Sequence, residues 1–485
     1  MLPGGGLVAS FDVHLAPGSR LVVGLEPERA AFELSRPGAA LPSLSIGGAP
    51  PVPLPARPGW LEPGGWRHVE IAGPVLAIDG RTFALGTAAE ALRVAVTRGR
   101  AQLSAVITSP ASEPAALLFD RLAELHARVP ADRFPTGATV GDRLYYDPGW
   151  TSGFYAGALW QAAALEPAGG MFARWATQAT IDHFGMERAP THDVGFMYGQ
   201  SSLNAWRALC GRGGTGGRAS PALCARLRTS VVSAASELLA LAATNPGSGT
   251  IPTDPTSPEG ETIVDSMMNI AILPWATSFT GSASYSRLAR HQANVIAALL
   301  VRRNGSTAQS ANFDRATGKL LSVTTHQGLS NRSTWSRGQG WALYGFAVAA
   351  IELHDRGFLR VASRVAAYVA AHLPAGGVPR WDYDAPAGAP VDVSAGVITA
   401  AGLLHLAAAC RQLGGLECDA ASEARWVALA RRMLTAALGG YASARPPLGL
   451  LRSQIEDEHF HGCWCNSGEL IYGLSYALEA MKLQR

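Results

Sequence analysis

The chain carries little charge of either sign. Charged residues make up 16% of its 485 positions, against about 25% in an average globular protein. Lys and Arg number 40 and Asp and Glu number 37, so the formal net charge is only +3. A nearly neutral chain presents no basic surface for nucleic acid or for an anionic membrane, and both partner classes are excluded on this ground.

Long apolar runs are also missing. No uninterrupted stretch of about 18 apolar residues occurs, so no membrane-spanning helix is expected. The opening residues, MLPGGGLVASF, lack the basic start and the long apolar core of a secretory signal. Hydrophobic residues nevertheless make up 48% of the chain, which predicts a folded core rather than disorder. The length favours two domains over one.

The six cysteines do not form paired Cys-x-x-Cys motifs, so no metal site and no metal cofactor are expected. Cys210 and Cys224 bracket a Gly-rich stretch, and Cys410 and Cys418 bracket RQLGGLE. Each pair flanks an expected connection between helices, where a disulfide can close the loop. Six buried free thiols explain the same residues. Disulfides would place the protein outside the cell or in the periplasm, whereas free thiols leave the cytoplasm open.

Residues 1–110 differ from the rest of the chain. Short segments such as LVASFDVHL, WRHVEIAG and ALRVAVTR alternate between polar and apolar residues, and Pro and Gly clusters separate them. This pattern predicts a small antiparallel β-sandwich as an accessory domain. Trp60 and Trp66 are candidate stacking platforms for a sugar, although two tryptophans in a sandwich more often belong to the core or an interface.

Residues 111–485 show helical periodicity and a coarse repeat. Six segments are small and apolar nearly all round, and they begin near 150, 193, 264, 335, 392 and 465. Six amphipathic stretches alternate with them, near 115–129, 171–185, 221–243, 284–302, 357–372 and 420–438. An all-apolar helix must be buried, and an amphipathic one covers it. The alternation therefore predicts a mainly α catalytic domain, an (α/α)6 barrel of six inner and six outer helices.

In such a barrel the inner helices run in the same direction, so their N-terminal ends gather at one mouth. Asp193, in THDVGFMYG, and Asp265, in ETIVDSMMN, each open an inner helix. Two carboxyl groups in one apolar cleft separate each other's pKa values, so that one holds a proton while the other is ionised. Such a pair of carboxyl groups can act in general acid/base catalysis. Taken singly, each aspartate is also explained as a helix N-cap.

Several motifs resemble the unsaturated glucuronyl hydrolases over roughly residues 115–485. HDVGFMYG, VDSMMNIAILPWA, THQG, STWSRGQGWALYGFA and DVSAGVITAAGLLHLA occur in the family's order. The resemblance implies an (α/α)6 hydrolase acting on oligosaccharides that polysaccharide lyases release. An N-terminal sandwich is not usual in that family.

The resemblance also implies roles for particular residues. Asp265 matches the general acid/base and Asp193 its paired carboxylate, while Trp150 matches an aromatic that stacks on the unsaturated ring. The other matched residues line the substrate pocket, and they are His192, His326, Gln327, Arg337 and Trp341. Arg337 is the candidate receptor for the substrate carboxylate, although a structural ion pair explains an arginine there too. His326 is equally explained as a loop histidine.

The reaction that the family suggests is hydration of the C4=C5 double bond of a non-reducing-end uronic acid. The chain departs from the family pattern at Gln309, where many members have His, and at Asp254, where a Trp is expected. The closing segment, LIYGLSYALEAM, also differs from the family's usual run. The first two departures affect the side that holds the next sugar, and hence substrate preference more than chemistry.

Other functions fit parts of the pattern. An unsaturated rhamnogalacturonyl hydrolase shares the barrel, and a conventional inverting glycosidase uses two carboxylates on the same scaffold. A polysaccharide lyase also joins helices to a sandwich, but usually in the opposite order. A sugar-binding protein without activity is the non-enzymatic alternative. The source of the substrate, sulfate tolerance and oligomeric state are left open by the sequence.

Overall fold

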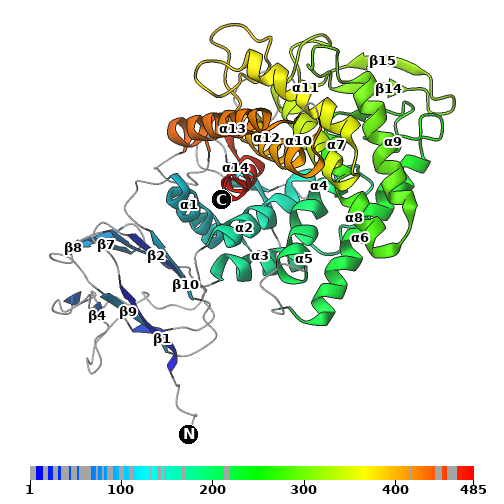
Figure 1. Ribbon diagram of the computed structural model, residues 1–485. Coiled ribbons are helices and arrows are strands. Elements are labelled where there is room, and N and C mark those ends of the chain that lie inside the picture. The colour runs from blue at the N-terminus through cyan, green and yellow to red at the C-terminus, as the bar shows by residue number, and fades with distance from the viewer. Residues whose placement is uncertain are drawn as a thin grey trace. The chain divides into compact units, whose positions relative to one another are not determined.

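A computed structural model of the chain (Figure 1) describes the strands between residues 7 and 108 and most of the remaining sequence. The described ranges beyond those strands are 114–130, 133–138, 144–146, 149–166, 170–211, 219–415, 418–442, 451–455 and 467–485. Backbone contacts divide the chain into two units, Met1–Arg128 and Val129–Arg485. Each unit is described by itself.

The N-terminal unit contains two larger antiparallel sheets. One has the order β1-β9-β3 and the other β10-β2-β6-β7-β8. A separate pair, β4 and β5, forms a third sheet. The strands are β1 (Leu7–His14), β2 (Arg20–Leu25), β3 (Ala31–Glu33), β4 (Ser43–Leu44), β5 (Val52–Pro53), β6 (Arg67–Ala72), β7 (Val75–Ile78), β8 (Arg81–Ala84), β9 (Ala91–Thr97) and β10 (Leu103–Thr108).

The packing of these sheets into a sandwich stays a prediction, and Trp60 and Trp66 lie outside the described residues. The helix α1 (Pro114–Arg128) contacts β2 and β10 and groups with this unit. We predicted the domain boundary between residues 110 and 111 and counted this helix among the outer helices of the barrel. In the structure the division follows α1 instead of preceding it.

In the second unit, all six predicted apolar segments form helices, although the sixth helix begins at Ile471, after a strand at Ser467–Leu470, and not near 465. Three of them are not regular α-helices throughout. The first begins with a 3-10 turn, the second contains a π-helical turn, and the third breaks near Ile270. The inner segments are η1 (Trp150–Gly153) with α2 (Phe154–Leu165), α4 (Val194–Tyr198) with η2 (Gly199–Leu203) and α5 (Asn204–Leu209), α7 (Ser266–Asn269) with α8 (Ile272–Thr280), α10 (Ser336–Glu352), α12 (Val393–Leu413) and α14 (Ile471–Leu483).

Each inner segment contacts the next, and α14 closes the ring on α2. Contacts at two levels show that α10, α12 and α14 run in the same direction. At the N-terminal ends, Arg337 of α10 pairs with Asp392 before α12 at 3.1 Å. Farther along the same helices, Tyr344 in the middle of α10 donates to Glu479 of α14 at 2.7 Å, and His405 of α12 lies 3.0 Å from the same carboxylate. The ring of inner segments that the repeat predicted is therefore present, and these three helices in it are parallel.

Five amphipathic helices of this unit pack on the inner segments that precede them. They are α3 (Met171–Asp182), α6 (Pro221–Ala243), α9 (Ala283–Leu299), α11 (Arg356–His372) and α13 (Ala420–Tyr441). Short strands fill the connections at the N-terminal mouth: β11 (Pro135–Ala138), β12 (Leu144–Tyr146), β13 (Thr262–Ile263), β14 (Ser310–Phe313), β15 (Leu320–Thr324), β16 (Gln454–Ile455) and β17 (Ser467–Leu470). The architecture is an α/α barrel.

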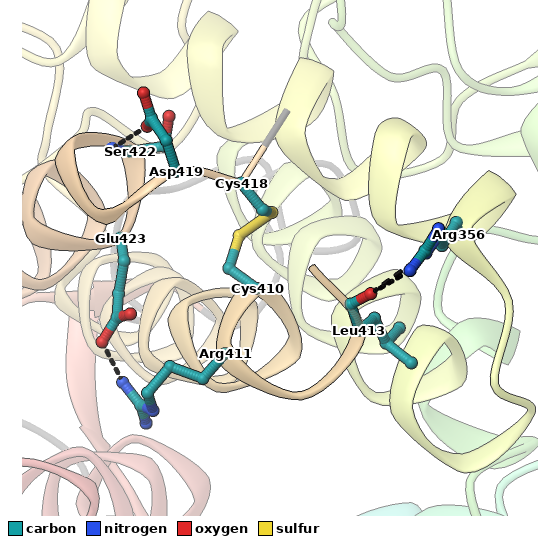
Figure 2. The surroundings of a disulfide bond; sticks show 8 residues. All are labelled: Arg356, Cys410, Arg411, Leu413, Cys418, Asp419, Ser422 and Glu423. Carbon is teal, nitrogen blue, oxygen red and sulfur yellow. Dashed lines mark hydrogen bonds and ion pairs between the residues drawn. A yellow bond between two sulfur atoms is a disulfide. The ribbon is translucent and has the colours of Figure 1, made fainter. Parts of the chain in front are cut away.

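Both predicted cysteine pairs are bonded. Cys210 follows α5 and pairs with Cys224 in α6, and Cys410 in α12 pairs with Cys418 just before α13. Figure 2 shows the second bond closing the turn between an inner and an outer helix, next to Asp419. The disulfide explanation, and not that of free thiols, holds for these four residues.

One helix in the described part of the chain, α12, is long and apolar enough to cross a membrane. In its most apolar window, 89% of the residues are buried inside the fold. The composition of this helix follows from its place in the inner ring, where neighbours surround it on all sides.

Candidate active site

Asp193 and Asp265 occupy the N-cap positions of α4 and α7, yet neither side chain caps its helix. Elsewhere in the barrel, aspartates at the same position do cap. Asp392 accepts a hydrogen bond from the Ser394 backbone N–H, and Asp419 accepts one from Ser422. The N-cap explanation that the sequence left open therefore fails for the two candidate acids.

The backbones of α4 and α7 approach unusually closely, and this contact brings the two aspartates together. A Cβ atom on Gly195 would lie 2.2 Å from the carbonyl oxygen of Asn269, far inside van der Waals contact. Only glycine leaves room for the backbone of the other segment at this point. The Asp-Val-Gly and Asp-Ser-Met-Met-Asn motifs thus position each other through backbone packing.

Gly195→Ala is expected to separate α4 from α7 and to destabilise the protein by about 1–3 kcal/mol, the usual cost of overpacking. Thermal unfolding measures the change. Gly439→Ala is the matched control, since this glycine lies in α13 with open space around it. The control should leave stability unchanged or slightly higher. Equal melting temperatures for Gly195→Ala and the wild type would refute the contact's importance.

Asp265 is half-buried, and its Oδ2 atom is shielded from solvent and has no hydrogen-bond partner among the described residues. Burial raises the pKa of Asp265 to about 6. A protonated His192 ring and the Arg337 guanidinium would each oppose the rise, and the Asp193 carboxylate adds to it. A carboxyl group with this pKa keeps a proton near neutral pH far more often than an exposed aspartate does. A carboxyl group in this state can donate a proton as a general acid.

Asp193 is surrounded by hydrogen-bond donors. The Thr191 hydroxyl donates to Oδ2 at 3.2 Å, and the Asn269 amide donates to Oδ1 at 3.4 Å. The Nε2 atom of His192 lies 3.4 Å from the same Oδ1. The side chain is 21% exposed, so solvent reaches it. Asp193 therefore accepts hydrogen bonds, whereas the Oδ2 atom of Asp265 has no partner among the described residues, and this difference is what an acid/base pair needs.

Aromatic rings line the interior next to the two carboxyl groups. Trp150 begins η1, is half-buried, and packs against Phe196 and Tyr472 with ring centroids 5.6 and 4.9 Å away. Trp341 is buried and packs between Phe196 and Tyr476. Of the two predicted tryptophans, only Trp150 keeps an exposed part that a sugar ring can contact. Trp341 packs against the Phe196 ring inside the barrel.

Arg337 is only 2% exposed. Its Nη1 atom pairs with Asp392 and donates to the Ile455 carbonyl, and its guanidinium lies 4.7 Å from the Trp335 ring centroid. This is the structural ion pair that the sequence left as an alternative. Recognition of a substrate carboxylate by Arg337 stays a prediction.

The loop carrying His326 and Gln327 is held by Gln309. The Gln309 side-chain oxygen accepts from the His326 and Gln327 backbone N–H groups at 2.7 and 2.9 Å, and its amide donates to the Gln327 side chain at 2.8 Å. The Gln309 carbonyl accepts from the backbone of Val264, next to Asp265. Gln309, where many members of the family have His, thus holds the loop that carries His326 and Gln327 beside Asp265.

His326 is half-exposed and pairs with Glu261, a carboxylate that the sequence analysis missed. Burial raises the pKa of Glu261, but the hydrogen bond and charge of His326 outweigh it and lower the pKa overall. Asp254 is exposed and caps a turn by accepting from Thr256 at 2.7 Å. Glu261 lies four positions before Asp265, and that spacing was the available signal.

Asn269 also belongs to the site and was not predicted to do so, although it ends the Asp-Ser-Met-Met-Asn motif. It is fully buried and contacts both His192 and Asp193. Its position four residues after Asp265, on the first turn of the helix, was the signal. Within the described ranges, no group of three or more His, Cys, Asp or Glu side chains is arranged to hold a metal ion.

Comparison with known proteins gives a consistent result, although no protein-family model matches the chain. An unsaturated glucuronyl hydrolase of Bacillus sp. (strain GL1) is 30% identical over 368 residues, which cover 73% of this chain and 92% of the relative. An unsaturated chondroitin disaccharide hydrolase of Streptococcus pneumoniae is 28% identical over 269 residues, covering 54% of this chain and 64% of that protein.

Solved structures show the same fold. The unsaturated glucuronyl hydrolase of Bacillus sp. GL1 matches with a TM-score of 0.66 and 26% identity, over 77% of this chain and 96% of that one. An unsaturated glucuronyl hydrolase described as specific for heparin matches with a TM-score of 0.68 at 24% identity, over 76% and 95% of the two chains. The motifs, the barrel and a relative matched over nearly its whole length agree: this chain belongs to the unsaturated glucuronyl hydrolase family.

Proposed function

We propose that the protein is a glycoside hydrolase that removes the 4,5-unsaturated uronic acid from the non-reducing end of oligosaccharides made by polysaccharide lyases. The single observation that carries the proposal is the asymmetric carboxyl pair. The Asp265 carboxyl group, whose Oδ2 atom is shielded from solvent, has a pKa raised to about 6, while Asp193 beside it accepts two hydrogen bonds and lies 3.4 Å from His192 Nε2. Membership of the family supplies the substrate class, and the pair supplies the chemistry.

In the proposed reaction, the Asp265 carboxyl group donates its proton to C4 of the C4=C5 double bond. Positive charge then develops at C5 and is shared with the ring oxygen. Water adds at C5 and loses its proton to a carboxylate of the pair. The resulting hemiketal opens, and the bond to the next sugar breaks. The steps need a proton donor, an acceptor and water, which the pair and the solvent supply.

Substrate binding follows from the surroundings of the pair. Trp150 offers its exposed part to the sugar ring. His326, half-exposed, and Gln327 are proposed to contact hydroxyl groups of the sugars, because the Gln309 anchor holds their loop beside the site. The two disulfides support an extracellular or periplasmic location.

The pH dependence of kcat/KM is a direct consequence of the raised pKa. The acid must carry its proton to react, and the protonated fraction of Asp265 falls as pH rises through about 6. We therefore expect kcat/KM to fall about tenfold per pH unit above this value. Initial rates between pH 5 and pH 8 measure it. A rate that is flat or rises over this range would contradict the assignment of Asp265.

A panel of lyase products identifies the substrate. Unsaturated disaccharides from glycosaminoglycans and from other uronate polysaccharides, with and without sulfate, are incubated with the protein. Loss of the double-bond absorbance reports turnover. We expect at least one unsaturated glucuronyl product to react. A protein inactive on every glucuronyl product but active on an unsaturated rhamnogalacturonan product would instead support the sister activity.

A further inference from the structure

Asn269 is a buried amide whose two ends bind different partners. Its Oδ1 atom accepts a hydrogen bond from the Phe196 backbone N–H at 2.7 Å. A backbone N–H can only donate, so this contact fixes which end of the amide is oxygen. The NH2 group must then point the other way, where it lies 3.4 Å from His192 Nδ1 and 3.4 Å from Asp193 Oδ1. Asn269 thus presents donors to both residues.

The orientation of Asn269 decides the state of the His192 ring. An amide NH2 group only donates, so Nδ1 of His192 must accept. The second contact of Nδ1, the Ser266 hydroxyl at 3.3 Å, can donate as well. With Nδ1 acting as acceptor, the ring proton sits on Nε2, the atom that lies 3.4 Å from Asp193. The hydrogen bonds to Nδ1 therefore determine that Nε2 carries the ring proton and faces the Asp193 carboxylate.

We propose that Asn269 is a positioning residue that holds His192 as the neutral Nε2–H tautomer, directed at Asp193. The Ser266 hydroxyl can donate or accept, whereas the Asn269 NH2 group can only donate, so the contact with Asn269 decides that Nδ1 is an acceptor. A positive ring at His192 would lower the pKa of Asp265. Keeping the ring neutral therefore favours the protonated form of the acid. The effect on turnover rests on the proposed function, whereas the tautomer is a property of the free protein.

The tautomer is measured in the wild-type protein without any substrate. The ring nitrogens of 15N-labelled histidine give distinct chemical shifts for the two neutral tautomers and for the imidazolium. The chain has 12 histidines, so the His192→Gln variant is used to assign the signals of His192. We expect the Nε2–H pattern at neutral pH. An Nδ1–H pattern or an imidazolium pattern would overturn the inference, whatever the protein turns over.

The variant Asn269→Asp tests whether Asn269 determines the tautomer of His192. The substituted side chain has the same shape and keeps an oxygen for the Phe196 N–H, but it replaces the NH2 donor with a second acceptor. We expect the His192 signals to leave the Nε2–H pattern and kcat on the unsaturated disaccharide to fall at least tenfold, with KM nearly unchanged. Asn204→Asp, which removes an amide donor in α5, is the control and should keep both properties.

The outcomes separate the two hypotheses. An unchanged His192 pattern in Asn269→Asp would overturn the inference, and so would a changed pattern with full turnover. If the wild type shows the Nε2–H pattern, the variant loses it, and no unsaturated sugar is hydrolysed, the proposed function fails while the assignment of the tautomer to Asn269 stands.

Discussion

Asp265→Asn is expected to reduce turnover of an unsaturated disaccharide by roughly 10²–10⁴-fold, the usual loss when one positioned acid/base group is removed. The amide has the shape of the carboxyl group but cannot release a proton to C4. The fold should persist, because the Asp265 side chain caps no helix and its Oδ2 atom has no hydrogen-bond partner among the described residues. Loss of double-bond absorbance measures turnover, and circular dichroism and thermal unfolding report the fold.

Asp419→Asn is the matched control for Asp265→Asn. Asp419 occupies the same N-cap position, on the outer helix α13, and accepts a hydrogen bond from the Ser422 backbone. Its replacement should cost at most a modest amount of stability and no activity. Undiminished turnover in Asp265→Asn, with a normal fold, would remove Asp265 from the role of acid.

Arg337→Ala is expected to destabilise the protein by about 3–5 kcal/mol, because it leaves the carboxylate of Asp392 buried without its counter-charge. Three other hydrogen bonds still bind Asp392, from the Ser394 N–H and hydroxyl groups and from the Ile455 N–H, and they do not neutralise its charge. A lower melting temperature is the expected readout. This result would assign Arg337 to the support of the barrel mouth, between α10 and α12.

The double variant Arg337→Met/Asp392→Asn tests the pair as a unit. Replacing both charges removes the uncompensated carboxylate, so the melting temperature should recover most of the loss seen in Arg337→Ala. The competing explanation predicts something different: if Arg337 binds the substrate carboxylate directly, Arg337→Ala keeps a normal melting temperature and raises KM for the uronate alone. The two measurements together decide between these roles.

The barrel could be predicted from the sequence because its signal is repetitive. Six segments apolar all round and the amphipathic helices between them leave few other arrangements, and the N-terminal position of each aspartate on its helix follows directly. The chain division after Arg128 was not predictable, since α1 shows the same amphipathic pattern as the outer helices of the barrel.

Pairwise contacts within the site were less accessible to sequence reasoning. The sequence placed Asp193 and Asp265 at one mouth, but the closeness of their helices depends on the missing Cβ of Gly195, which no periodicity reveals. The partners of Arg337 come from residues 392 and 455, far away along the chain. A charged side chain in a motif shows that a charge is needed there, and only the fold shows which opposite charge it meets.

A matched pair of substrates tests the central claim most directly. One is an unsaturated glucuronyl disaccharide, and the other is the same disaccharide with a saturated uronic acid. Because the proposed proton transfer needs the C4=C5 double bond, we predict release of the second sugar from the unsaturated compound alone, in step with loss of the double-bond absorbance. Comparable cleavage of the saturated disaccharide would contradict hydration by the Asp193 and Asp265 pair and would support a conventional glycosidase.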